Sequence, residues 1–132
     1  MKTVLCHGCF DVLHIGHIMH LRAAAALGDR LVVSITASPY IRKEGRPIFN
    51  DNERAYALAA LRSVDQVYTC YARTGVNAIL YIRPDIYVKG MDYISIGLNE
   101  LERAACNEVG AKIIFTSTEK YSSTDVIRRA FK

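Results

Sequence analysis

The stretch at residues 6–17, CHGCFDVLHIGH, places two cysteines and three histidines close together in the chain. It overlaps the end of the apolar run at 2–6 (KTVLC) and leads into a segment with helical spacing of apolar residues at 16–27. A strand, a turn and a helix are therefore predicted in succession. Three chemistries could use such a stretch: a redox dithiol, a zinc site or a phosphate-binding loop.

The cysteines of this stretch favour neither the redox nor the zinc interpretation. A redox pair needs an exposed first thiol of low pKa at a helix start, whereas Cys6 ends an apolar run and no helix is expected before Gly16. A zinc site made of both cysteines and the two following histidines has ligands of the right type, but its two pairs lie closer together than in a zinc finger. We therefore expect all four cysteines of the chain to be reduced thiols, and no metal site built by the protein alone.

The phosphate interpretation needs a strand, a glycine-containing turn and a helix whose first N–H groups face the anion. Gly8 would allow close approach to the backbone after the first strand, and Gly16 stands at the helix start, where a side chain would block a phosphate. His14 and His17 are three residues apart, so both can face one bound group. Each can donate a charge-assisted hydrogen bond to it. His20, one turn further on, is expected to be an ordinary packed helix residue.

The rest of the chain alternates between strand-like and helix-like segments. Short β-branched or aromatic runs predict strands at 2–6, 30–36, 66–70, 85–89 and 111–116. Helical spacing of apolar residues predicts helices at 16–27, 51–62, 74–82, 98–109 and 123–131. Because the strands are nearly continuous apolar runs, we predict an α/β fold with a parallel sheet covered on both faces.

Local signals mark several helix ends and one long loop. Gly28 and Gly110 are placed to close helices in the left-handed conformation. Asn50 and Glu53 form the pattern of a capping box at the start of the second helix. The segment 37–50 (ASPYIRKEGRPIFN) contains prolines, a glycine and basic residues, and we expect it to be an irregular substrate loop.

Composition limits the classes of function. The net charge is +4, and 51% of the 132 residues are hydrophobic. No run of lysines and arginines alternates with aromatic residues as in a nucleic-acid groove, the apolar runs are too short to cross a membrane, and the first residues do not form a secretory signal. We expect a single cytoplasmic domain, residues 1–132, that binds a small anionic substrate and neither nucleic acid nor membrane.

Gly8-Cys9-Phe10-Asp11 followed by His14-Ile15-Gly16-His17 resembles the signature of the cytidylyltransferase-like nucleotidyltransferases, a branch of the H-x-G-H superfamily. The resemblance continues, in the same order, through 27–35 (LGDRLVVSI), 46–67 (RPIFNDNERAYALAALRSVDQV), 84–93 (PDIYVKGMDY) and 122–127 (SSTDVI). It implies a Rossmann-like three-layer sandwich with a five-stranded parallel sheet. The implied reaction is attack of a phosphate monoester on the α-phosphorus of a nucleoside triphosphate, with release of pyrophosphate.

The resemblance also implies roles for individual residues. The catalytic residues would be His14, His17 and Lys43. The nucleotide would be bound by Gly8, Cys9, Phe10, Asp11, Gly16, Gly90, Asp92, Ser122, Ser123 and Thr124. The other substrate would be bound by Arg46, Arg54 and Lys89. Mg²⁺ would enter with the triphosphate, and the chain would act as a homodimer.

Three of these residues have alternative interpretations. Lys43 and Arg46 lie in the irregular loop, where basic side chains are often simply solvated. Asp11 would repel a triphosphate unless it helps to hold Mg²⁺ or orients the turn. We favour the turn role, because Asp side chains commonly accept hydrogen bonds from backbone donors two residues further on.

The likeness is strongest to the adenylyltransferase domains that join ATP to D-glycero-β-D-manno-heptose 1-phosphate. Glycerol-3-phosphate cytidylyltransferase and FAD synthetase-like adenylyltransferases are the alternatives. The cytidylyltransferase form carries Arg-Thr-Glu-Gly-Ile-Ser-Thr-Thr where this chain reads STEKYSST at 117–124, and the missing arginine favours ATP over CTP. A nucleotide-binding sensor without catalysis is the other class of function, but the presence of both His14 and His17 favours an enzyme.

Overall fold

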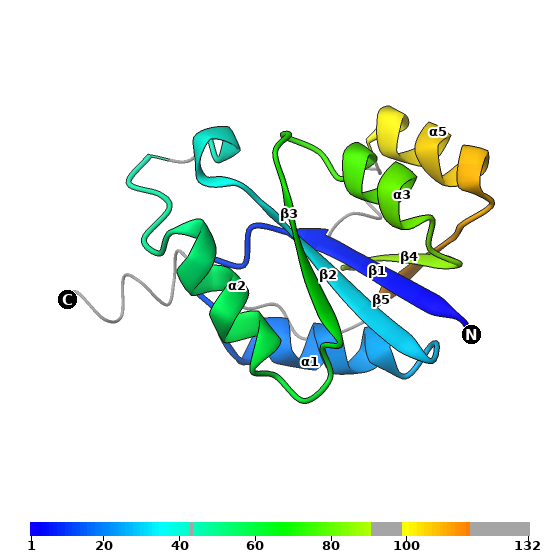
Figure 1. Ribbon diagram of the computed structural model, residues 1–132, viewed down its shortest axis with the longest axis horizontal. Coiled ribbons are helices and arrows are strands. Elements are labelled where there is room, and N and C mark those ends of the chain that lie inside the picture. The colour runs from blue at the N-terminus through cyan, green and yellow to red at the C-terminus, as the bar shows by residue number, and fades with distance from the viewer. Residues whose placement is uncertain (43, 91–98, 117–132) are drawn as a thin grey trace.

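The computed structural model describes residues 1–42, 44–90 and 99–116 (Figure 1). One sheet contains β1 (Thr3–Gly8), β2 (Arg30–Thr36), β3 (Gln66–Cys70), β4 (Ile86–Gly90) and β5 (Lys112–Thr116). All strand pairs are parallel, in the order β3-β2-β1-β4-β5. The helical elements are α1 (Ile15–Ala25), the short 3-10 helix η1 (Ser38–Tyr40), α2 (Asp51–Ala59), α3 (Val76–Ile82) and α5 (Glu100–Val109).

The helices cover both faces of the sheet. Figure 1 shows α1 and α2 on one side of it and α3 and α5 on the other. Alternate residues of each central strand therefore enter two separate cores: Val4, Val33 and Val88 pack toward α1 and α2, and Leu5, Val32 and Tyr87 pack toward α3 and α5. A strand buried on both faces must be apolar at successive positions, which explains the continuous apolar runs. The predicted three-layer α/β sandwich with a five-stranded parallel sheet is confirmed.

The predicted boundaries are close to the observed ones. The strands at 30–36 and 66–70 agree at both ends, and the other three differ by one or two residues. Helices α1 and α2 end earlier than expected, and the predicted helix at 123–131 lies outside the described residues. No helix in the described part of the chain is both long and apolar enough to cross a membrane.

Two of the three predicted helix-end signals are confirmed. Asn50 accepts a hydrogen bond from the Glu53 N–H at 2.8 Å, and Glu53 accepts one from the Asn50 N–H at 3.0 Å, which is a capping box. Gly110 has φ 75° and closes α5. The prediction for Gly28 was wrong: α1 ends in the right-handed Ala26, and Gly28 instead leaves room for the backbone of Lys2, whose carbonyl oxygen would lie 2.8 Å from an added Cβ.

The strand order creates a topological switch point at the carboxyl edge of the sheet. Strands β2 and β3 lie on one side of β1, and β4 and β5 lie on the other side. The connections that follow β1 and β4 therefore run in opposite directions along the sheet. Ligands of open α/β sheets bind at such a switch point, beyond the carboxyl ends of the strands. The turn that contains the H-x-G-H residues follows β1, and Gly90 ends β4. The histidine stretch therefore lies at the switch point.

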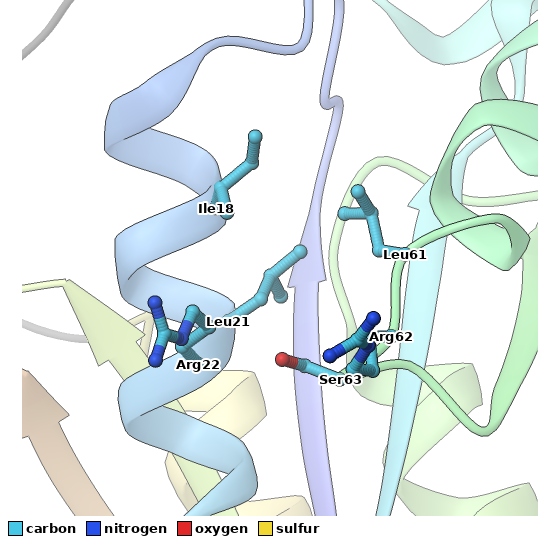
Figure 2. A pocket seen from close by; sticks show the side chains of 6 residues that line it. All are labelled: Ile18, Leu21, Arg22, Leu61, Arg62 and Ser63. Atoms are coloured by element: carbon cyan, nitrogen blue, oxygen red, sulfur yellow. The ribbon is translucent and has the colours of Figure 1, made fainter.

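A surface pocket of about 300 Å³ lies between α1 and the segment that leads into β3 (Figure 2). It is lined by Ile18, Leu21, Arg22, Leu61, Arg62 and Ser63. Because residues 61–63 precede β3, this pocket lies toward the amino edge of the sheet. It is therefore distinct from the switch point at the carboxyl edge.

Candidate active site

The turn after β1 is held by an aromatic ring. Phe10 adopts a left-handed backbone (φ 52°) and is buried. A Cβ added at Gly8 would lie 3.0 Å from the ring of Phe10, and that ring lies 5.2 Å from the His17 ring, centroid to centroid. The space that a side chain at position 8 would take is occupied by Phe10, and the approach of a phosphate to the Gly8 backbone stays a prediction. The turn that presents the histidines is shaped by this packing.

His14 and His17 cap the helix that carries them. His14 is the N-cap of α1, and its Nδ1 accepts a hydrogen bond from the Gly16 N–H at 3.1 Å. The His14 N–H donates to Nδ1 of His17 at 3.2 Å, and the two rings stack with centroids 3.9 Å apart. Two histidines thus form a reciprocal capping box, a role usually taken by Ser or Thr with Glu. The H-x-G-H spacing fixes both rings at the helix start.

These contacts determine which nitrogen of each ring carries the proton. Nδ1 accepts a backbone N–H in both rings, so a neutral ring must carry its proton on Nε2. Burial lowers the pKa of His14, and burial together with the nearby His14, His20 and Arg46 lowers the pKa of His17 to about 4. The charge-assisted donors expected from the sequence are therefore neutral Nε2–H donors near pH 7. Neutral donors can still bond an oxyanion, and they bind it without being titrated over the neutral range.

Asp11 connects the first turn to the irregular loop. Its buried carboxylate accepts hydrogen bonds from Arg46 Nε at 2.8 Å, from the Ile48 N–H at 2.8 Å and from the Phe49 N–H at 2.9 Å. Burial acts to raise the pKa of Asp11, but these donors together lower it. Asp11 was expected to bond donors two residues further on. Its observed partners are 35 to 38 residues away, so it anchors the loop and is not shaped to hold a nucleotide.

Arg46 contributes to the same anchor. Its side chain is only 9% exposed, and its Nε is committed to Asp11. The alternative of a solvated loop charge was therefore wrong. Its charge is felt at His17, where it helps to lower the pKa. Arg46 thus lies near the histidine pair with its side chain held in place.

Arg54 of α2 is a structural residue at the centre of this edge. Its guanidinium is 2% exposed. It donates to the carbonyls of Phe49, Cys9 and Thr36 at 3.0, 2.9 and 2.7 Å, to the Ser38 hydroxyl at 3.3 Å and to the Asp51 carboxylate at 2.6 Å. All three nitrogens of the group are engaged with the protein. The prediction that Arg54 binds substrate directly was therefore wrong; it fixes the ends of β1 and β2 and the loop between β2 and α2.

Polar residues occupy the carboxyl ends of the three central strands on the α3 and α5 face. Nδ1 of His7 lies 2.7 Å from the Ser34 hydroxyl, and its Nε2 lies 3.3 Å from the Thr36 hydroxyl. Burial, followed by the charge of Lys89, lowers the pKa of His7 to about 4, so His7 is a neutral buried residue near pH 7. Lys89 is 7% exposed, and its Nζ lies 3.6 Å from the Glu102 carboxylate. Lys89 is therefore an internal cation and not a surface lysine.

His20 links α1 to the last described strand. Its Nδ1 lies 2.7 Å from the Thr116 hydroxyl at the end of β5. Burial lowers the pKa of His20, and the charge of Lys89 lowers it further. As predicted, His20 is a packed helix residue, but it also brings the carboxyl end of β5 against the helix that begins with the histidine pair.

The cysteines do not form a redox pair. Cys6 is fully buried in β1, and burial raises the pKa of its thiol to about 12. All four cysteines are free. In the described part of the chain, no three His, Cys, Asp or Glu side chains come together in a way that could hold a metal ion. Cys9 enters the site through its backbone, since its carbonyl accepts from Arg54.

The structure places some of the predicted site residues and not others. Gly16 is buried in the first turn of α1, and a Cβ added at Gly90 would meet none of the described residues within 4 Å. The predicted residues Lys43, Asp92, Ser122, Ser123 and Thr124 lie outside the described residues.

Sequence reasoning missed Glu102, which belongs to the same edge. It is 5% exposed and lies in an amphipathic helix, where its position three residues before Ala105 could have indicated an inward side chain. Its partners are distant in the chain, and no local pattern predicts them.

Comparison with known proteins agrees with the geometry. A family model described as cytidylyltransferase-like matches residues 5–129. The bifunctional protein HldE of Koribacter versatilis is 39% identical over 131 residues, and that of Geobacter sulfurreducens is 34% identical over 135 residues. The alignments cover 97% and 99% of this chain, but the chain spans only 27% of the length of either relative.

Two solved structures show the same fold. The lipopolysaccharide core biosynthesis protein of Thermoplasma volcanium superimposes with a TM-score of 0.74 at 31% identity, over 92% of this chain and 99% of that protein. Pantoate-beta-alanine ligase of Francisella tularensis superimposes with a TM-score of 0.66 at 16% identity, over 96% of this chain and 65% of that one. The second likeness shows the fold alone.

The match to the family model and to the HldE relatives shows that this parallel α/β sheet belongs to a nucleotidyltransferase-like domain. The chain belongs to the cytidylyltransferase-like family, as its match to the family model over nearly its whole length shows.

Proposed function

We propose that this chain transfers AMP from ATP to a sugar 1-phosphate, with D-glycero-β-D-manno-heptose 1-phosphate as the first candidate, and releases pyrophosphate. The observation that carries the proposal is the interlocked pair His14 and His17 at the start of α1: both Nδ1 atoms accept backbone N–H groups, so each neutral ring carries its proton on Nε2. A helix start with two such donors at the carboxyl edge of a parallel sheet is suited to a bound phosphate chain.

The reaction needs no nucleophile from the protein. A phosphate oxygen of the acceptor attacks the α-phosphorus of the triphosphate, a new P–O bond forms, and the bond to the β-phosphate oxygen breaks so that pyrophosphate leaves with its electron pair. The protein aligns the two substrates and stabilises the negative charge that develops on the α-phosphate and the leaving group. His14 and His17 donate to these oxygens.

The divalent ion belongs to the substrate in this proposal. We infer that the nucleotide binds as its Mg²⁺ complex, with the ion held by phosphate oxygens. Both carboxylate oxygens of Asp11 already accept hydrogen bonds from the loop, so Asp11 is not offered as a ligand. The described residues contribute neutral and cationic donors at this edge, which suits a substrate that brings its own cation.

The choice of acceptor rests on the relatives. Relatives at 34–39% identity are named HldE, and the structure at 31% identity is named a lipopolysaccharide core biosynthesis protein. A saccharide acceptor is therefore favoured over glycerol 3-phosphate or FMN. The choice of ATP rests on the sequence, because Ser117 stands where the cytidylyltransferase form has an arginine that can bond the cytosine carbonyl.

A panel assay tests the proposal. Pyrophosphate release is measured with ATP, CTP, GTP and UTP, each combined with heptose 1-phosphate, glycerol 3-phosphate or FMN. We expect ATP with heptose 1-phosphate to be preferred by roughly a hundredfold or more in kcat/KM, since a site built for one base leaves its polar groups unpaired with another. A preference for CTP with glycerol 3-phosphate would contradict it. Tight ATP binding without turnover on any acceptor would favour the sensor alternative.

The homodimer and the cytoplasmic location also remain proposals. The outer side of α1 exposes Ile15, Ile18 and Met19 by 56%, 36% and 38%, beside the pocket of Figure 2, and apolar side chains of this kind are suited to a two-fold contact. Light scattering at working concentration is expected to give twice the chain mass, and a monomer would contradict the homodimer.

A further inference from the structure

Glu102 is a buried carboxylate that the reaction outlined above does not use. It lies in the first turn of α5 and contacts the N-cap of α3 and two residues of β4. One oxygen accepts a hydrogen bond from the Gly75 N–H at 2.9 Å, and the other accepts one from the Tyr87 hydroxyl at 2.9 Å. The second oxygen also lies 3.6 Å from Nζ of Lys89. The carboxylate is thus fixed by two donors before it meets the lysine.

Packing around this carboxylate leaves little freedom of movement. A Cβ added at Gly75 would lie 2.6 Å from the Tyr87 hydroxyl and about 3.1 Å from the ring of His7. Burial acts to raise the pKa of Glu102, but Lys89, the Gly75 N–H and the Tyr87 hydroxyl together lower it. Glu102 is therefore a charged and immobile group at neutral pH.

Stability alone does not account for the Lys89–Glu102 pair. A buried ion pair loses the hydration of both charges, and its replacement by apolar residues is often neutral or stabilising. A glutamine of the same size could accept from the Gly75 N–H through its one amide oxygen, but its NH2 group could only donate to the Tyr87 hydroxyl. The carboxylate alone provides two acceptor oxygens together with a fixed counter-charge for the ammonium of Lys89.

The position of Lys89 relates this pair to the active site. Lys89 follows Val88, which is paired with Cys6 of β1, so Lys89 lies beside His7 at the switch point between β1 and β4. Its charge lowers the pKa of His7 on one side of the sheet and of His20, one turn after His17, on the other. The ammonium is therefore within electrostatic reach of the helix that begins with the histidine pair.

We propose that Glu102 is a positioning residue for the acceptor: it holds the ammonium of Lys89 at the switch point, where that ammonium meets the phosphate of the sugar 1-phosphate. The proposal rests on the proposed function for the identity of this substrate. An ammonium has three donors, so Lys89 can face Glu102 and the acceptor phosphate together. The triphosphate meets the histidine pair on α1, and Glu102 therefore acts on acceptor binding and not on ATP binding.

The test compares Glu102→Gln with two matched variants. Glu102→Gln keeps the size and an acceptor oxygen but removes the charge, and we expect the KM for heptose 1-phosphate to rise roughly tenfold while the KM for ATP stays within about twofold. Tyr87→Phe removes a hydroxyl from the same carboxylate but keeps the ion pair, and Glu108→Gln removes an exposed carboxylate from the same helix. Glu108→Gln should not change the KM for the acceptor. Tyr87→Phe removes one of the two donors that fix the carboxylate, so it should raise this KM by less than Glu102→Gln does.

A double-variant cycle separates positioning from general destabilisation. Adding Glu102→Gln to Lys89→Met should raise the KM for the acceptor no further than Lys89→Met does alone, because the two residues act as one unit. A purely structural Glu102 would lower the melting temperature and leave both KM values unchanged. That result, or an equal rise in the KM for ATP, would overturn the proposal.

A binding measurement distinguishes this proposal from the proposed function. Calorimetric titration of heptose 1-phosphate into the nucleotide-free protein needs no turnover. If the wild-type chain binds the sugar phosphate and Glu102→Gln weakens that binding about tenfold, the positioning role stands even where no pyrophosphate is released and the proposed reaction fails. If the wild-type chain turns over and Glu102→Gln binds normally, only the positioning role is wrong. A wild-type chain that neither binds the sugar phosphate nor turns it over overturns both.

Discussion

Replacement of Arg54 by methionine should unfold the carboxyl edge of the sheet and not merely weaken the binding of a substrate. The guanidinium donates to three backbone carbonyls, one hydroxyl and one carboxylate, and it is 2% exposed. Methionine fills most of the same volume but has no donor. The variant therefore leaves several acceptors without a partner in a site that water reaches poorly.

The expected cost follows from these contacts. An unsatisfied buried acceptor costs about 1–3 kcal/mol, and removal of one partner from a buried charged network costs about 3–5 kcal/mol. Because water and local movement recover part of the loss, we expect about 3–5 kcal/mol for Arg54→Met. In a domain of this size that lowers Tm by roughly 12–20 °C. Arg54→Lys keeps the charge but has fewer donors, so it should lose roughly half as much.

Thermal unfolding followed by circular dichroism measures this loss, with activity measured in parallel. Arg62→Met is the matched control, since Arg62 is exposed, and it should change stability by less than about 0.5 kcal/mol. If Arg54 instead touched the substrate, Arg54→Met would lose activity and keep its wild-type Tm. An unchanged Tm would refute the structural role argued here.

Three further predictions concern the first turn and its neighbours. His17→Ala should lower kcat by roughly two to three orders of magnitude with little change in KM, because a donor to developing charge is lost; near-normal turnover in a folded variant would contradict this. The pKa values of His7 and His17 are about 4 in the folded chain and about 6.5 in the unfolded chain. Between these two pH values the unfolded state therefore binds more protons than the folded state. The free energy of unfolding consequently falls as the pH falls through this range. Urea unfolding should show a loss of about 2 kcal/mol from each histidine between pH 7 and pH 5, and equal stability at the two pH values would be the contrary result. The double variant Cys6→Ala, Cys9→Ala should keep measurable activity, and metal analysis of the purified wild-type protein should find no stoichiometric zinc; one zinc per chain would restore the zinc interpretation.

Local patterns predicted the elements well because they depend on near neighbours in the chain. The apolar runs at 30–36 and 66–70 gave strands with the observed boundaries, and Asn50 with Glu53 gave the observed capping box. Glycine was interpreted less well. Gly28 leaves room for the backbone of Lys2 and does not form a left-handed turn, and a side chain at position 8 would meet the ring of Phe10. A glycine in a sequence indicates a need for space but does not show what occupies it.

The sequence alone determined the class of fold, the position of the helix that begins with the histidine pair, and the family, because strand and helix periods, helix caps and the H-x-G-H spacing are all local. Only the tertiary structure decided how the charged residues of the site are used. Asp11 and Arg46 are 35 residues apart and Gly75 and Glu102 are 27 apart, so their pairing arises when the strands align. Burial in that alignment also makes the histidines neutral donors. The sequence specifies the type of each residue, but its hydrogen-bond partners and its protonation state depend on which other residues the fold places beside it.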